Sequence, residues 1–335
     1  MSSPAISVVM SAYNAEKYIG EAIDSILNQT FKDFEFIIVD DASTDKTLSV
    51  VENYKDRRIK ILRNEKNLKL AASLNKGLRI SQGKYIARMD ADDISHLERL
   101  EKLYDFLEQN PNVDICGTPM KLFGSEDAVW GRNTEDKEIK AGLIWGSTMQ
   151  HGTVLMRKDK ILEHNLFYDE SFHVGQDWKY WYDAKNYVTF SNLKQSLYFY
   201  RRGEQNITIQ HSHESKDRYA TMHRIMLTDM GITFSEHELK LHQFIMGLLS
   251  VPPSPQTINE ARSWLEKLIS HNRAMKEYDA FSFEKIAYQH WSRLFYRIVP
   301  NGFHTIFAYV LVSGISLMQL SYYIKYSINK FIGRK

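Results

Sequence analysis

Cysteine is almost missing from this chain of 335 residues, with a single example at Cys116. One thiol excludes an internal disulfide framework and is typical of proteins from a reducing compartment. Cys116 follows Val113 and Ile115 in an apolar segment, so we interpret it as a buried packing residue rather than a nucleophile. No basic region followed by a long apolar stretch precedes Ile6, so no signal peptide is predicted. These absences predict a cytoplasmic protein.

A strong excess of one charge is also missing. The chain has 43 basic residues (Lys and Arg) against 41 acidic ones, which leaves a formal net charge of +2. It has no basic patch with interleaved aromatic residues, so we expect no binding to nucleic acid. Internal repeats and low-complexity tracts are absent as well. With 43% hydrophobic residues, the composition is that of an ordinary globular protein with ample material for a core.

The first ninety residues alternate between short apolar runs and helical patterns. The runs, which are the candidate strands, cover residues 6–10, 34–39, 59–62 and 85–89. Between the first two, apolar residues recur at the spacing of one helix face, at Ile19, Ala22, Ile23, Ile26 and Leu27. A second such stripe follows the fourth run, at Leu97, Leu100, Tyr104 and Leu107. Strands joined by crossover helices predict an α/β fold with a mostly parallel central sheet, and ligands bind beyond the carboxyl ends of its strands.

Polar residues follow three of these candidate strands. The first strand runs into residues 11–14, the second into 40–45 and the fourth into DADD at 90–93, and we expect these ends to converge. Carboxylate oxygens favour hard cations such as Mg²⁺ or Mn²⁺, and an Asp-x-Asp at a strand end can hold such an ion together with a bound diphosphate. An alternative is that one of the last two aspartates caps a helix beginning near His96.

Together these segments resemble the family 2 glycosyltransferases, whose nucleotide-sugar-binding fold is called GT-A. The matching stretches are ISVVMSAYNAE at 6–16, SILNQT at 25–30, IIVDDASTD at 37–45, residues 67–78, ARMDADDI at 87–94, HGTVLMR at 151–157, QDWKYW at 176–181 and Tyr200-Arg201. The likeness covers roughly residues 4–210. It is greatest to bacterial enzymes that extend lipopolysaccharide, capsule or related surface glycans. The resemblance implies a GT-A domain over 1–210, followed by a helical region over 211–335.

The resemblance also implies a donor site. Ser11, Tyr13 and Asp41 would bind the donor nucleotide, with Tyr13 stacked on the uracil and Asp41 accepting the uracil N3 proton, which favours a UDP-sugar. The alternative for Tyr13 and Asp41 is a turn residue and a helix N-cap. Lys69 lies where many relatives carry glycine, and its cation could reach a phosphate. A solvated lysine at a helix start is the alternative there.

The resemblance also implies a metal-binding site and a catalytic base. Asp90 resembles the carboxylate that binds ribose or shares the metal, and Asp92 would coordinate Mn²⁺ or Mg²⁺ bridging the two phosphates. Asp93 would support the metal site from behind or cap a helix. Asp177 matches the general base that deprotonates the acceptor hydroxyl, so that the attack inverts the anomeric configuration. The alternative is that Asp177 only caps a helix over 178–185.

Two positions depart from the family pattern. Gln176 replaces the first acid of the usual Glu-Asp pair, and Gly203 stands where many relatives have a histidine two residues after the arginine. The resemblance assigns Gln176, Trp178 and His151 to acceptor binding or active-site support. For His151, a structural histidine with satisfied hydrogen bonds is an equal alternative.

Beyond residue 210 the pattern predicts helices near 213–230, 235–249, 255–270, 274–299 and 303–332. The stretch 303–324 is largely apolar but holds too many polar residues for a good spanning segment, and Lys325, Lys330, Arg334 and Lys335 follow it. These features favour a helix lying on the cytoplasmic face of a membrane, over 303–335. A buried core helix or a homodimer contact is the alternative.

The function predicted is therefore an inverting, metal-dependent glycosyltransferase. It would move a hexose or N-acetylhexosamine from a UDP-sugar, by single displacement, to a hydroxyl of an oligosaccharide or lipid-linked glycan acceptor. A non-catalytic relative that binds a sugar nucleotide or glycan is one alternative. A nucleotidyltransferase that makes sugar nucleotides is a weaker one, because no glycine-rich phosphate loop follows the first strand.

Overall fold

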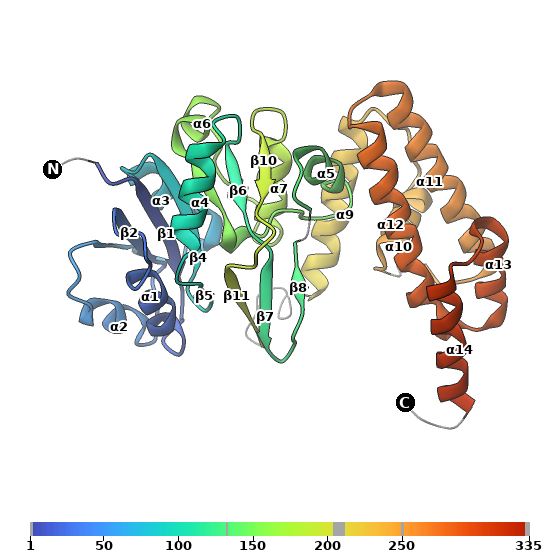
Figure 1. Ribbon diagram of the computed structural model, residues 1–335, viewed down its shortest axis with the longest axis horizontal. Coiled ribbons are helices and arrows are strands. Elements are labelled where there is room, and N and C mark those ends of the chain that lie inside the picture. The colour runs from blue at the N-terminus through green and yellow to red at the C-terminus, as the bar shows by residue number, and fades with distance from the viewer. Residues whose placement is uncertain (1–2, 132, 204–211, 249–250, 332–335) are drawn as a thin grey trace. The chain divides into compact units, whose positions relative to one another are not determined.

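The computed structural model describes residues 3–131, 133–203, 212–248 and 251–331 (Figure 1). The chain divides into two compact units, Met1–Arg218 and Tyr219–Lys335. A domain boundary was predicted between residues 210 and 211. Both positions belong to the stretch 204–211, which lies outside the described residues.

The first unit is built on a seven-stranded sheet with the order β10-β6-β9-β4-β1-β2-β3. Its parallel half consists of β1 (Ile6–Ala12), β2 (Phe34–Asp40), β3 (Ile59–Arg63) and β4 (Tyr85–Asp90). The other half holds β6 (Ile115–Gly117) and β10 (Phe190–Asn192), which pair in parallel, and β9 (Leu155–Arg157), which runs antiparallel between β4 and β6. The predicted α/β fold with a mostly parallel sheet is confirmed.

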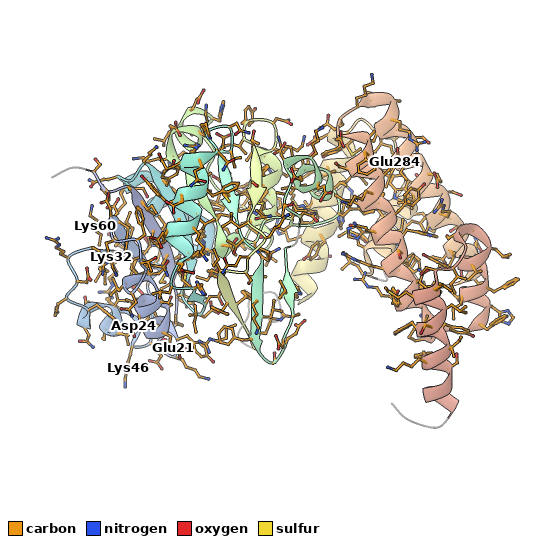
Figure 2. All side chains as sticks on the ribbon, viewed as in Figure 1. Glu21, Asp24, Lys32, Lys46, Lys60 and Glu284 are labelled. Atoms are coloured by element: carbon orange, nitrogen blue, oxygen red, sulfur yellow. The ribbon has the colours of Figure 1, made fainter. Side chains whose placement is uncertain are left out.

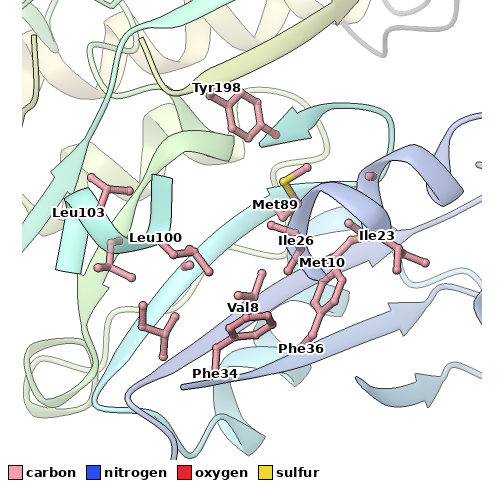
Figure 3. Close-up of a cluster of buried hydrophobic side chains, with 14 of the residues drawn as sticks. Val8, Met10, Ile23, Ile26, Phe34, Phe36, Met89, Leu100, Leu103 and Tyr198 are labelled. Carbon is pink, nitrogen blue, oxygen red and sulfur yellow. The ribbon is translucent and has the colours of Figure 1, made fainter. Parts of the chain in front are cut away.

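Helices connect and cover these strands. In chain order, the first four are α1 (Ile19–Leu27), α2 (Thr47–Asn53), α3 (Lys69–Ile80) and α4 (Arg99–Gln109). Four of the five residues in the first predicted stripe are buried, and Figure 3 shows Ile23 and Ile26 beside Met10, Phe36 and Met89 of the sheet. Burying each such side chain contributes roughly 1.5–3 kcal/mol, so this core holds β1, β2 and β4 in register.

A second, four-stranded sheet lies in the same unit and was not predicted from the sequence. Its order is β5-β11-β7-β8, formed by β5 (Ile94–Ser95), β11 (Tyr198–Arg202), β7 (Met120–Gly124) and β8 (Val129–Trp130). The remaining short elements are α5 (Asp136–Gly142), the 3₁₀ turn η1 (His151–Thr153), α6 (Lys158–Glu163) and α7 (Gln176–Ala184). Through β11, residues near 200 reach the segment that follows β4.

The second unit is helical. Its elements are α9 (Ser212–Asp229, which begins before the unit), α10 (Glu236–Met246), α11 (Pro255–Met275), α12 (Ala280–Ile298), η2 (Val299–Asn301), α13 (Phe303–Ser313) and α14 (Leu317–Phe331). Glu284, labelled on α12 in Figure 2, pairs with Arg273 of α11 at 2.7 Å. The prediction of one helix over 303–332 was wrong, because the chain turns at Gly314, whose φ of +70° ends α13. None of the described helices is both long and apolar enough to span a membrane.

Candidate active site

The polar ends of β1, β2 and β4 meet at one edge of the main sheet. In the strand register, Ser11 lies opposite Asp90 of β4, and Ala12 lies opposite Asp40 of β2. Parallel strands bring their carboxyl ends to the same side, so the residues that follow each strand share one site. The predicted convergence of these three strand ends is confirmed.

The loops after β1 and β2 are tied together. The Asn14 backbone N–H donates to Ser43 Oγ at 3.1 Å, and the Thr44 backbone N–H donates to Asn14 Oδ1 at 2.8 Å. Asn14 adopts a φ of +49°, which asparagine tolerates better than most residues. The loop places the ring of Tyr13 toward solvent, with 48% of the residue exposed. An exposed ring fixed beside the strand ends can stack on a flat ligand.

Asp41 is buried and organises the start of α3. Its carboxylate accepts hydrogen bonds from the Leu68 N–H at 2.8 Å, the Lys69 N–H at 2.9 Å and Asn64 Nδ2 at 2.7 Å. The N-cap alternative is therefore partly right, since Asp41 binds N–H groups at a helix start, but the helix is α3 and lies 28 residues further along the chain. A carboxylate offers about four acceptor positions, so one remains for a ligand.

Lys69 begins α3 in a left-handed conformation with φ of +72°. Glycine adopts this conformation at little cost, whereas a side chain costs about 1–2 kcal/mol, which explains why glycine suits this position. The Lys69 side chain is exposed.

Two buried arginines support the acidic end of β4. Arg88 Nη2 contacts Asp90 Oδ1 at 2.6 Å, and Arg99 Nη1 binds the backbone oxygens of Arg88 at 3.0 Å and Gly152 at 2.5 Å. Burial disfavours the charge on Arg88, but the Asp90 carboxylate outweighs this effect and raises the pKa of Arg88. The Asp90 N–H also donates to Tyr198 Oη of β11 at 3.2 Å. Asp90 is thus fixed by Arg88 of its own strand and by Tyr198 of β11.

Asp92 and Asp93 have different surroundings. Asp92 is partly exposed, and burial together with the charge of Asp90 raises its pKa to about 6. Asp93 is fully buried, and its Oδ1 accepts a hydrogen bond from the Arg201 N–H at 2.8 Å, while Arg201 Nε donates to the Asp92 backbone oxygen. Arg201 also pairs with Glu21, labelled in Figure 2. The alternative that one of these aspartates caps a helix near residue 96 was wrong, because α4 begins at Arg99 without a side-chain cap.

The turn η1 packs directly against this acidic group. A Cβ atom added at Gly152 would lie 2.3 Å from Tyr198 Oη and 2.8 Å from Asp90 Oδ2, so only glycine fits there. The neighbouring His151 Nε2 lies 2.8 Å from Tyr168 Oη. Burial, with a smaller effect of the Arg88 charge, lowers the pKa of His151 well below 6.5. His151 is therefore a neutral, hydrogen-bonded ring beside the site, which fits the structural alternative as well as active-site support.

Asp177 reaches the site from α7. Gly175, with φ of +74°, is the N-cap, so Asp177 is the second residue of the helix and not its cap. The alternative that it only caps a helix over 178–185 was therefore wrong. Ser147 Oγ donates to Asp177 Oδ2 at 3.2 Å. Burial raises the pKa of Asp177, and the charge of Asp90 raises it further, so the two carboxylates lie within electrostatic range of each other.

The neighbours of Asp177 on α7 are buried. Gln176 is 9% exposed at the first position of the helix. Trp178 is 2% exposed and its Nε1 donates to the Leu143 backbone oxygen at 2.7 Å. Trp178 thereby fixes α7, which carries Asp177, against the segment after α5.

Several residues of this network were missed by sequence reasoning. They are Arg88, Arg99, Tyr168, Tyr198 and Ser147. For Arg88 a signal existed, because it interrupts an apolar strand two positions before Asp90, and residues two apart on a strand point to the same face. The others come from distant segments, and no local pattern marks them.

Comparison with known proteins agrees with this fold. The sequence model of glycosyl transferase family 2 matches residues 7–175, which is half of the chain. An uncharacterized glycosyltransferase of Haemophilus influenzae is 32% identical over 238 residues, which cover 67% of this chain and 74% of that protein. TarS of S. aureus, solved in complex with UDP-GlcNAc, is similar with a TM-score of 0.60 at 19% identity, covering 85% of this chain and 91% of that one.

A second solved structure is similar over even more of the chain. The mannosyltransferase PcManGT of Pyrobaculum calidifontis, in complex with GDP-Man and Mn²⁺, has a TM-score of 0.55 at 16% identity and covers 93% of this chain and 87% of that one. At such identities the structures bear on the fold alone, and they confirm the predicted GT-A fold. The match to the family model, which extends through the strand ends described above, and the likeness to the Haemophilus relative show that this chain belongs to glycosyltransferase family 2.

Proposed function

We propose that this glycosyltransferase inverts configuration and depends on a divalent metal ion. It would transfer a hexose or N-acetylhexosamine from a UDP-sugar to a hydroxyl of a bacterial surface glycan. The observation that carries the proposal is the meeting of two carboxylate groups from distant segments. Asp90 ends β4 and Asp92 follows it, and Asp177, on α7, lies close enough for the charge of Asp90 to raise the pKa of Asp177.

Asp177 is the proposed general base. The acceptor hydroxyl gives its proton to the Asp177 carboxylate, the hydroxyl oxygen forms a bond to the anomeric carbon, and the bond from that carbon to the diphosphate breaks. One displacement inverts the anomeric configuration. Burial raises the pKa of Asp177, which makes its carboxylate a stronger base. Ser147 and the start of α7 hold its orientation.

The donor nucleotide would bind at the ends of β1 and β2. The exposed Tyr13 ring would stack on the base, buried Asp41 would accept a base N–H, and Ser11 lies beside Asp90 in the strand register. Lys69 is exposed near Asp41 and would contact a phosphate. TarS was solved with UDP-GlcNAc and the mannosyltransferase with GDP-Man, which supports a sugar-nucleotide donor.

The acidic end of β4 suits a hard cation. Asp90 and Asp92 offer oxygen ligands, and burial together with the charge of Asp90 raises the pKa of Asp92 to about 6, so a bound cation would favour its ionised form. Among the described residues no group of three or more His, Cys, Asp or Glu side chains could hold a metal, so the donor diphosphate would supply further oxygens. Mn²⁺ or Mg²⁺ held by Asp92 with Asp90 would stabilise the charge of the departing diphosphate.

The test is a donor panel with matched variants. Full-length protein would be incubated with individual UDP-sugars and GDP-mannose, in Mn²⁺ or in EDTA, and release of the nucleoside diphosphate followed. We expect metal-dependent release from a UDP-sugar, reduced at least about a hundredfold by Asp177→Asn and by Asp92→Ala. Asp183→Asn is the control, because Asp183 lies on the same helix in a surface pair with Lys179.

Three outcomes would contradict the proposal. Full activity in EDTA would exclude the metal, and activity of Asp177→Asn equal to that of Asp183→Asn would exclude Asp177 as the base. Binding of UDP and metal without turnover, even with a panel of glycan acceptors, would favour the non-catalytic sugar-nucleotide-binding relative. Proton resonances of the product sugar would show directly whether the anomeric configuration inverts.

A further inference from the structure

The last two helices of the chain expose large apolar side chains. On α13 these are Phe303, Phe307 and Leu311, spaced four residues apart on one helix face, while Ile306 and Tyr309 on the opposite face are buried. On α14 the exposed residues are Leu317, Met318, Leu320, Tyr322 and Ile324. We call these eight residues the apolar strip. Leu317 is 86% exposed and Met318 is 75% exposed, which is far from ordinary core packing.

Both helices are anchored with the apolar strip outward. α13 and α14 each pack on α12, and Gln319 of α14 is buried, with its Nε2 donating to Tyr309 Oη at 3.4 Å. The rings of Phe303 and Phe307 stack at 5.8 Å between centroids. The exposed side chains are therefore held on ordered helices. Apolar groups presented together in this way mark a site of interaction with a partner or a membrane.

The part of the sequence that carries the apolar strip has charge of one sign. Glu284 is the last acidic residue of the sequence, so residues 285–335 contain seven Lys or Arg and no Asp or Glu. The first 284 residues have the opposite balance, with 36 basic against 41 acidic residues. Lys325, directly after the apolar strip, is exposed. A second copy of this chain would bring two cationic ends together, whereas an anionic lipid surface is complementary to both the charge and the apolar side chains.

The lengths of α13 and α14 indicate whether these helices cross a membrane or lie on its surface. The 11 residues of α13 and the 15 of α14 span about 16 and 22 Å, which is less than the roughly 30 Å of a bilayer's hydrocarbon core. The helices also turn at Gly314 between them. A short helix with an exposed apolar face and neighbouring basic residues inserts that face shallowly among lipid headgroups.

A cleft beside the apolar strip is lined by aromatic, polar and apolar side chains. It has a volume of about 640 Å³ and is lined by Arg262, Tyr288, Trp291, Tyr309, Gln319 and the turn at 313–316, with Leu311 at its edge. The Arg262 guanidinium lies over the rings of Tyr288 and Trp291. Aromatic rings with a polar edge are enriched at the interface between lipid and water.

We propose that the apolar strip binds the surface of an anionic lipid bilayer, with the side chains of α13 and α14 inserted among the headgroups. The apolar strip belongs to the second unit and contains none of the residues proposed to bind the donor or metal or to act as the base. Membrane binding therefore does not depend on the proposed donor, base or metal. Its role would be to hold the enzyme where lipid-linked or membrane-bound glycans are found.

The test is co-sedimentation of the full-length protein with vesicles of phosphatidylcholine alone or with added phosphatidylglycerol, at low and high salt. We expect binding that requires the anionic lipid and weakens with salt. The double variant Phe307→Ser, Leu311→Ser should lower the vesicle partition coefficient about tenfold or more. Phe281→Ser is the matched control, because Phe281 is 77% exposed on the first turn of α12 and outside the apolar strip.

Unchanged circular dichroism and thermal unfolding would show that the double variant is folded. A second variant, Lys325→Glu, keeps the apolar strip intact and should also weaken binding to anionic vesicles, by roughly fivefold to tenfold. Equal binding to neutral and anionic vesicles, or equal binding by the double variant and wild type, would overturn the proposal. Dimers in lipid-free solution that the double variant abolishes would assign the apolar strip to a second copy of the chain instead.

Discussion

Acid should destabilise the helical unit, because this unit buries histidines in their neutral form. His223 of α9 and His242 of α10 are fully buried with their rings 4.7 Å apart, and Trp264 Nε1 donates to His242 Nδ1 at 3.5 Å. Burial, with a smaller effect of the nearby Arg293 charge, lowers the pKa of His290 on α12 from 6.5 to about 3. Burial likewise lowers the pKa of His223 well below 6.5.

The direction and size of the effect follow from proton linkage. An unfolded chain protonates a histidine below about pH 6.5, whereas His290 in the folded chain stays neutral down to about pH 3. Stability is therefore fully present above pH 6.5 and is lost as the pH falls from there toward the folded value. Each pH unit costs about 1.4 kcal/mol per histidine, so lowering the pH to about 5 should cost about 2 kcal/mol for His290. The lowered pKa of His223 acts in the same direction.

Urea unfolding at several pH values, comparing wild type with His290→Gln, is the assay. As the pH falls from about 7.5 to about 5, the difference in unfolding free energy between the two proteins should shift by about 2 kcal/mol in favour of the variant. His304→Gln is the control, because His304 is exposed on α13. If the difference between wild type and His290→Gln did not change with pH, His290 would have to be protonated within the folded unit, and the reasoning from burial would be refuted.

Three further predictions concern the first unit. Tyr13→Ala should weaken UDP binding about tenfold in calorimetry while Tyr13→Phe keeps it, because base stacking contributes about 1–3 kcal/mol; equal affinities would remove the stacking role. Gly152→Ala should lower the melting temperature and the activity together, because its Cβ would lie 2.3 Å from Tyr198 Oη, and wild-type behaviour would contradict that contact. Trp178→Phe loses the hydrogen bond to the Leu143 carbonyl and should cost about 1–3 kcal/mol of stability in urea, with no change in UDP affinity.

The strands of the parallel half could be predicted from sequence because their signal is local. The runs at 6–10, 34–39, 59–62 and 85–89 each fall inside an observed strand, and the observed strands extend them by one or two residues. Continuous apolar runs are what a sheet covered on both faces requires. The parallel connections then bring the strand ends to one edge, but the position of Asp90 beside Ser11 depends on the order of the strands, which the sequence leaves open.

The second sheet and much of the supporting network could not be predicted, because they depend on contacts between residues that are far apart in the sequence. β5 and β8 have two residues each, too few for any periodicity, and β5 pairs with β11 across more than a hundred positions of sequence. The role of Asp177 as a non-capping residue depends on the φ of Gly175, which the sequence leaves open. The metal, base and donor assignments were taken from family resemblance and stay predictions.

The antiparallel strand β9 has a consequence for synthesis of this protein. It is the bridge between β4 and β6, so β4 keeps one edge without a partner strand until residues 155–157 arrive. A nascent chain leaves the ribosome from its N-terminus, and β1 to β4 can pair well before that point. During this interval the open edge could recruit a neighbouring chain. We therefore expect truncations that end before β9 to aggregate, and expression yield to depend on chaperones that shield this edge.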